Sequence, residues 1–115
     1  MATWNIGSLA TFVYGIVPNI LDNISGNLVN LADQQRIFAQ TFTGQPISST
    51  NIPEQYQPGL VDLTCAEVIA LMESQMGNSR IADLSTGMDS SKLREEGLRK
   101  LRELGRHVNF YKAFG

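Results

Sequence analysis

The side chains best suited to chemistry in this 115-residue chain are one cysteine, one histidine and several scattered carboxylates. Cys65 stands inside an apolar run, where a thiol acts as a small buried hydrophobe, because a reactive cysteine needs exposure and positive neighbours. His107 has no serine, cysteine or aspartate at a spacing typical of a catalytic set. Asp62 and Glu67 are five residues apart, so they do not share one helix face squarely. The sequence therefore predicts neither a catalytic nor a metal site.

Cofactor motifs are missing from the sequence as well. Neither a G-x-x-x-x-G-K-[ST] loop nor a G-x-G-x-x-G loop occurs, and such loops bind the phosphates of nucleotides. One histidine and one cysteine cannot complete a zinc site, so no cofactor is expected. A single cysteine also cannot form an internal disulfide, which favours a reducing compartment. We therefore expect a protein that is not an enzyme and that works through its surfaces.

The composition indicates one ordered domain, part of whose surface is covered by a partner. Hydrophobic residues make up 43% of the chain and charged residues 17%, compared with about 25% charged residues in a typical soluble protein. Because so little charge is available for the surface, we expect some of that surface to be buried against a partner. No apolar run reaches the roughly 18 residues of a membrane span, so no membrane partner is expected.

Charge is divided unevenly along the chain. Residues 1–90 contain eight acidic and two basic residues, whereas residues 91–115 contain three acidic and seven basic residues. Glu95 and Arg99, and likewise Glu96 and Lys100, are spaced as i,i+4 pairs on the expected last helix. The basic segment 92–106 is therefore either a solvated or subunit-facing helix, or the surface of a small nucleic-acid-binding module.

The hydrophobic pattern predicts a mainly α fold: a small helical domain with three main helices, a short β hairpin or irregular excursion, and extended termini. We divide the chain into an N-terminal arm or short helix (1–18), a helical domain (19–105) and a C-terminal aromatic arm (106–115). The N-terminal segment is either a helix over residues 8–14 or an extended arm, because a short apolar run is ambiguous by its period alone.

Two helices are expected in the first two thirds of the chain. The first covers residues 19–43, with a break near Ser25 and Gly26 and an end at Gly44. Its apolar stripe consists of Ile20, Ile24, Leu28, Leu31, Phe38 and Phe42, with Gln35 filling the gap. After a surface loop over 45–51, a turn over 53–57 leads into a second helix from Pro58 to Gln75. Its run over 60–72 is apolar on most sides, which predicts the central helix.

A third helix is expected near the C-terminus. Residues 79–88 are predicted to form the hairpin or excursion, and the helix begins near Ser90 or Ser91, behind the capping residue Asp89. Gly105 is expected to end it. The predicted core consists of Leu28, Leu31, Phe38, Leu60, Val61, Val68, Leu71, Leu101 and Leu104.

Aromatic residues at both ends of the chain are the strongest positive signal. The predicted partner-binding residues are Phe110, Tyr111 and Phe114 near the C-terminus and Trp4, Phe12 and Tyr14 near the N-terminus. A chain end is normally polar and frayed unless something holds it. The C-terminal aromatics either fold back onto the core or insert into a neighbour, where aromatic anchors supply much of the binding energy.

Several segments together resemble a known family. The first helix ends in Phe38-Ala-Gln-Thr-Phe-Thr-Gly44, and Ile52-Pro-Glu-Gln-Tyr-Gln-Pro58 leads into the apolar run over 60–72. Ile81-Ala-Asp-Leu-Ser-Thr86 and a final helix follow, with Ala82 where the family pattern has glycine. This order of elements over residues 20–105 is similar to that of the head–tail connector (adaptor, or head completion) proteins of tailed double-stranded DNA bacteriophages.

The resemblance implies a structural virion protein at the head–tail interface, made in the host cytoplasm. It implies a homo-oligomeric ring, commonly dodecameric, that docks on the portal protein and extends the DNA channel to the tail. The partners implied are other copies of the chain, the portal and a downstream tail or stopper protein. We expect genomic DNA to pass through the ring without specific binding.

Overall fold

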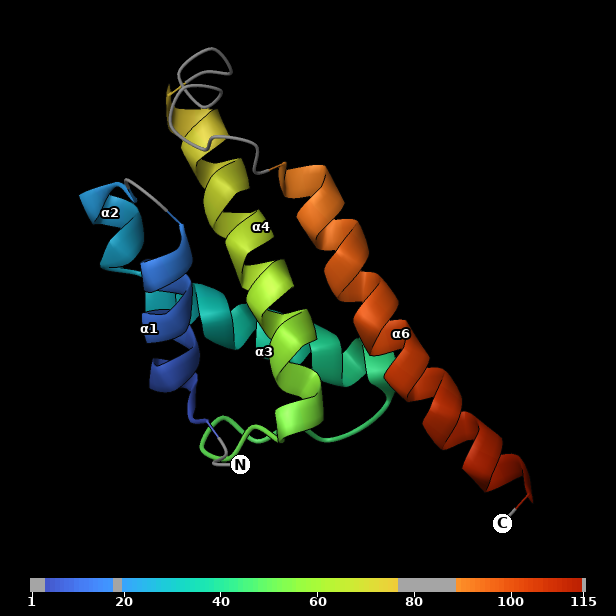
Figure 1. The fold of residues 1–115 in the computed structure, drawn as a ribbon. Coiled ribbons are helices and arrows are strands. Elements are labelled where there is room, and N and C mark those ends of the chain that lie inside the picture. Colours follow the sequence, from blue (N-terminus) through green and yellow to red (C-terminus); the bar gives the residue numbers. More distant parts are fainter. Residues whose placement is uncertain (1–3, 18–19, 77–88, 115) are drawn as a thin grey trace.

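The structure is a computed structural model that describes residues 4–17, 20–76 and 89–114, and the side chains of all of these except residues 76 and 105–114. The elements are α1 (Ile6–Ile16), α2 (Asp22–Ser25), α3 (Leu28–Thr43), the 3-10 turn η1 (Glu54–Tyr56), α4 (Gln57–Met76) and α6 (Ser90–Phe114) (Figure 1). The predicted mainly α fold is confirmed. The hairpin or excursion predicted over residues 79–88 lies outside the described residues.

Helix α4 is central, as its sequence predicts. It contacts α1, α2, α3, η1 and α6, and Figure 1 shows it between α1 and α6 with α3 crossing behind. Its fully buried side chains include Leu60, Leu63, Val68, Ile69 and Met72. Because these residues point to several sides of α4, the helix packs against neighbours in several directions.

The N-terminal segment forms a helix, which is one of its two predicted alternatives. Helix α1 extends over Ile6–Ile16 and is longer than the predicted residues 8–14, because Asn5 caps it. The Asn5 side chain accepts a hydrogen bond from the backbone N–H of Ser8 at 2.8 Å, which satisfies a free donor of the first turn. Leu9 and Val13 are fully buried, so this segment belongs to the core.

The predicted first helix is broken where its sequence indicates. Helix α2 ends at Ser25 and α3 begins at Leu28, so the break falls at Gly26 and Asn27. At the other end, Gly44 adopts a left-handed backbone conformation with φ of 71°, which a glycine adopts without steric cost. Both the break and the end of the helix are confirmed.

The buried stripe of α3 differs from the prediction. The buried residues are Leu28, Ala32, Gln35, Ala39 and Thr43, whereas Leu31 and Phe38 are only partly buried beside the core and Phe42 is exposed. Small residues occupy the middle of the stripe, so the crossing helices approach closely and the larger side chains are displaced to its flanks. The helical period of the stripe was predicted correctly, but most of the buried residues lie one position later in the sequence than the predicted ones.

The loop between α3 and η1 is not a simple surface loop, contrary to the prediction. Ile47 and Ile52 are fully buried. Two α3 side chains hold the backbone of Ile47: Arg36 donates to its carbonyl oxygen at 2.7 Å, and the Gln40 side chain accepts from its N–H at 2.9 Å. Because both polar groups of the Ile47 backbone are hydrogen-bonded in this way, this loop residue can be buried in the core.

Helix α6 begins as predicted but extends further. The Asp89 carboxylate accepts hydrogen bonds from the backbone N–H groups of Ser91 and Lys92 at 2.9 and 3.4 Å. The helix does not end at Gly105 and continues to Phe114, so residues 106–114 are a helical extension of the domain. A single interior glycine costs only about 1 kcal/mol, and good helix formers flank it. Figure 1 shows this last part projecting beyond the other helices.

The predicted core residues are buried in part. Leu28, Leu60, Val68 and Leu101 are buried. Leu31, Phe38, Val61, Leu71 and Leu104 are partly buried and pack against the core. The fully buried residues that the predicted core omits include Leu9, Val13, Ile47 and Ile52, and also Leu63, Ile69 and Met72 of α4. The first four belong to the N-terminal segment and to the chain between α3 and η1, where the sequence predicts no core helix.

Two glycines set the distance between α4 and α6. A Cβ atom at Gly59 would lie 2.9 Å from Cγ of Leu101. A Cβ atom at Gly97 would lie 3.0 Å from the carbonyl oxygen of Gly59 and 3.0 Å from Cγ of Leu63. The two helices therefore pack closely at a point where an added Cβ would have to displace Leu101 on one side, and Leu63 or the Gly59 backbone on the other.

We expect Gly97→Ala to lower the free energy of unfolding by about 1–3 kcal/mol, the cost of overpacking a tight contact, despite the better helix propensity of alanine. Gly59→Ala should lower it as well. Urea unfolding measures both. Gly15→Ala in α1 is the matched control, because a Cβ there meets nothing within 4 Å. A gain in stability for Gly97→Ala equal to that of Gly15→Ala would contradict the close contact.

Candidate functional site

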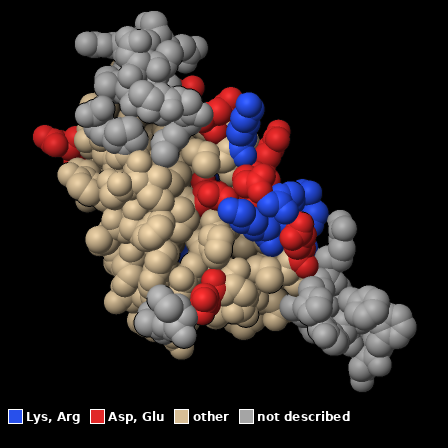
Figure 2. All heavy atoms as spheres, viewed as in Figure 1, with Lys and Arg blue, Asp and Glu red and all other residues tan. Residues whose placement is uncertain are grey.

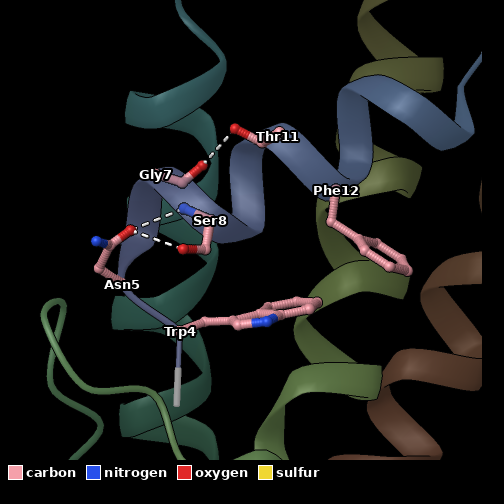
Figure 3. Close-up of a pocket in the computed structure, with 6 residues that line it drawn as sticks. All are labelled: Trp4, Asn5, Gly7, Ser8, Thr11 and Phe12. Carbon is pink, nitrogen blue, oxygen red and sulfur yellow. Dashed lines mark hydrogen bonds between the residues drawn. The ribbon is translucent and has the colours of Figure 1, made fainter. Parts of the chain in front are cut away.

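Two of the predicted partner-binding aromatics lie against each other at the N-terminal end of the fold. The ring centroids of Trp4 and Phe12 are 5.1 Å apart, with the rings tilted by 39°. Figure 3 shows both rings extending to the same side of α1, next to its capped first turn. Phe12 keeps 48% of its surface exposed. The sequence identified both residues but gave no sign that they pair.

Backbone contacts fix the position of Trp4. Trp4 forms an isolated antiparallel bridge with Ile52, in which its N–H donates to Ile52 at 3.3 Å and its carbonyl oxygen accepts from Ile52 at 2.6 Å. Because the Ile52 side chain is fully buried, this bridge anchors the segment that precedes α1. Trp4 is thus held at a defined place on the surface of the domain.

The Trp4–Phe12 pair forms one wall of a groove, which we call the N-terminal groove. Its lining residues are Trp4, Phe12, Glu54, Gln57, Pro58, Val61, Asp62 and Lys100, and its volume is about 470 Å³. These residues come from the N-terminal segment, from η1 and α4, and from α6. The groove combines aromatic and aliphatic walls with the exposed carboxylate of Glu54.

The other charged groups in the groove neutralise each other. Nζ of Lys100 donates to the Asp62 carboxylate at 2.7 Å, and this ion pair links α6 to α4. Lys100 thus forms its ion pair with Asp62 and not with Glu96, its predicted i,i+4 partner, although its charge still contributes to lowering the pKa of the Glu96 carboxyl, which Arg99 lowers most. The carboxylate of Glu54 is the acidic group that this groove leaves at its exposed edge.

Of the four other basic residues of α6 with described side chains, Arg94 and Arg99 are engaged, whereas Lys92 and Arg102 are exposed. Arg99 pairs with Glu96 and, at 2.9 Å, with Glu103, and not with Glu95 as predicted. Arg94 lies over the Phe38 ring at 5.4 Å from its centroid. In Figure 2, red and blue atoms alternate along this side of the molecule. The helix therefore presents a mixed surface and not a continuous positive one.

A second exposed surface lies over α1 and α3. Tyr14, the third N-terminal aromatic, is 59% exposed and Val29 is 49% exposed. Both line a shallow hollow of about 350 Å³ with Gly7, Ala10, Thr11, Ser25 and Leu28. Helix α1 contains no charged residue, and Figure 2 shows few charged atoms on the visible side of the molecule where α1 lies. Tyr14 thus lies on a different surface from Trp4 and Phe12.

The C-terminal candidates are placed only by their backbone. Phe110, Tyr111 and Phe114 lie in the projecting part of α6, and their side chains are outside the described residues, as is that of His107. The structure therefore brings Trp4 and Phe12 together, separates Tyr14 from them, and carries the C-terminal aromatics away from the body on a helix.

Cys65 is buried in α4, with 2% of its surface exposed. Burial, with a smaller contribution from the Asp62 carboxylate, raises the pKa of its thiol to about 12. A thiol with so high a pKa is a poor nucleophile at neutral pH. In the described part of the chain, no three His, Cys, Asp or Glu side chains lie close enough to hold a metal ion. None of the described helices is long and apolar enough to cross a bilayer.

Comparison with protein-family models, with curated proteins and with solved structures finds no match to this chain. Its function must therefore be inferred from its own surfaces. The N-terminal groove and the hollow over α1 and α3 are both concave and both expose apolar side chains, which is typical of binding surfaces.

The Cys65 thiol should make stability depend on pH in alkaline solution. The unfolded thiol loses its proton near its ordinary pKa of 9.0, whereas the folded thiol keeps it to about pH 12. Between these values the unfolded state binds fewer protons, so stability falls as pH rises, by at most about 1.4 kcal/mol per pH unit. Urea unfolding from about pH 8 to about pH 10.5 measures this fall. Cys65→Ala should show a shallower slope, and equal slopes would contradict the buried, protonated thiol.

Proposed function

We propose that this chain is a structural virion subunit of a tailed phage, a head–tail adaptor that assembles into a ring on the portal and extends the DNA channel toward the tail. The observation that supports this most is the apolar character of the segments near both ends of the chain. A groove with the half-exposed Phe12 ring and the partly buried Trp4 ring lies beside the N-terminal segment, and the C-terminal part of α6, which carries three aromatic residues, projects from the body.

The order of the elements also supports the proposal. Helix α3 ends in the Phe42-Thr43-Gly44 step, a turn with Pro53 and Pro58 starts the central helix α4, and α6 closes the domain. This is the order on which the resemblance to connector proteins rests. The structure adds a helical α1 to the domain, for which the resemblance has no counterpart.

The physical basis of assembly in this proposal is the burial of apolar surface between copies. Such burial stabilises a contact by about 25 cal/mol per Å² before the costs of ordering are subtracted. A head-to-tail contact that repeats around an axis closes a ring. The chain then needs no catalytic group, because its role is to hold copies, the portal and a downstream tail or stopper protein together.

The electrostatics fit a channel through which DNA passes without specific binding. Residues 1–90 contain four times as many acidic as basic residues. Among the basic side chains of α6, Arg99 and Lys100 are paired with carboxylates. A surface with few free cations releases few counterions from DNA and therefore binds it weakly.

Assembly with portal tests this proposal. Mixing the purified chain with the portal protein of the same virus should give ring-shaped particles in negative-stain electron microscopy. Truncation after Gly105 should leave the domain folded, as measured by circular dichroism, because the removed helix projects from the body. The truncated chain should join the particles less. A full-length chain that stays monomeric with every virion component would overturn the proposal.

The nucleic-acid-binding alternative has its own test. If α6 bound phosphate through residues 92–106, the chain would be retained on duplex DNA at low salt and released as salt rises. We expect no retention, because Arg99 and Lys100 are already paired. Strong retention that Arg102→Gln weakens would favour the alternative.

A further inference from the structure

The N-terminal groove combines apolar walls with the exposed carboxylate of Glu54. Its walls include the Trp4 and Phe12 rings, Pro58 and Val61, and Phe12 is almost half exposed. Asp62 is neutralised by Lys100 at 2.7 Å, whereas the Glu54 side chain is exposed at the groove. A ligand with aromatic groups next to a lysine or arginine would match both the walls and this carboxylate.

The projecting end of α6 has this chemistry. Residues 104–115 contain no acidic residue and two basic residues, Arg106 and Lys112. Leu104 packs against the core of its own chain, and beyond it Val108 and Tyr111 occupy positions i and i+3 of the helix, which share one face. Phe114 lies at one edge of that face by its position in the helix, and Lys112 lies at the other. We call residues 106–114 the C-terminal tip.

The tip cannot occupy the groove of its own chain. Lys100 lines the groove and belongs to the same continuous helix as the tip. Phe114 is fourteen residues further along this helix, which places it about 21 Å beyond Lys100 at 1.5 Å per residue. Figure 1 shows the tip pointing away from the body. An occupant with this sequence must therefore come from a second copy.

We propose that the C-terminal tip of one copy docks in the N-terminal groove of the next, with its apolar face against Trp4 and Phe12 and Lys112 donating to the Glu54 carboxylate. This inference rests on the proposed function, since it names the contact through which copies associate. The contact is heterologous, because the tip and the groove are different surfaces. Each copy uses its tip to bind one neighbour and its groove to bind the other, so the repeated contact leads to a ring or an open chain.

Two half-contact variants test this arrangement. The groove variant is Phe12→Ser with Glu54→Lys, and the tip variant is Tyr111→Ser with Lys112→Glu. Each should weaken self-association at least about tenfold, as measured by analytical ultracentrifugation. Mixed together, they should form a one-to-one dimer, because an intact tip from one meets an intact groove on the other. A mixture that remains monomeric would overturn the proposal.

Charge reversal gives a second, independent readout. Glu54→Lys alone and Lys112→Glu alone should each weaken association. The two changes combined in one chain should restore it, because the ion pair can form again with its two charges exchanged. Val29→Glu is the matched control, since Val29 is as exposed as Phe12 but lines a different hollow. Loss of association with Val29→Glu as large as with the groove variant would overturn the assignment to the groove.

Trp4 provides a direct probe of the groove, because it is the chain's single tryptophan. Its emission should shift to the blue when full-length copies associate, and it should not shift with concentration in the tip variant. Wild-type protein that stays monomeric with unchanged Trp4 emission up to millimolar concentration would overturn the contact. If the tip variant forms particles on the portal as readily as the wild-type protein does, the contact between tip and groove is also overturned, whereas the proposed function stays intact.

Discussion

The close contact between α4 and α6 at Gly59 and Gly97 determines most of the structure. Because both positions are glycine, where a Cβ atom would crowd its neighbours, the two helices approach closely, and Leu101 fits beside Gly59 as a fully buried residue. This contact fixes the rotation of α6, so that Lys100 meets Asp62 at 2.7 Å. It also directs the last turns of α6 away from the body, where they are free to reach another molecule.

The same geometry creates the N-terminal groove. Helix α4 supplies one side of it and Lys100 of α6 contributes to its charged end, while the bridge between Trp4 and Ile52 brings the first residues of the chain to the other side. Two ends of the sequence thus contribute to one surface. In the head-to-tail contact that we propose, the groove near the N-terminus of one copy takes the projecting helix at the C-terminus of the next.

Much of the helical framework was predictable because it depends on local signals. Gly44 with its left-handed backbone, Asp89 as a cap, Pro53 before η1 and Pro58 in the first turn of α4 act within a few residues of their position. The errors came where distant contacts decided the outcome. Ile47 is buried because Arg36 and Gln40 bind its backbone, and α3 buries Ala32 and Ala39 in place of Leu31 and Phe38 because other helices cross it closely.

The sequence by itself determined that the fold is helical, that α4 is central, and that the aromatic residues near the two ends are the notable surface features, since periodicity, caps and composition are properties of the chain alone. Only the tertiary structure decided which aromatics meet. Trp4 and Phe12 pair beside Glu54 while Tyr14 lies over α3, because the bridge to Ile52 and the rotation of α1 depend on packing between residues far apart in the sequence.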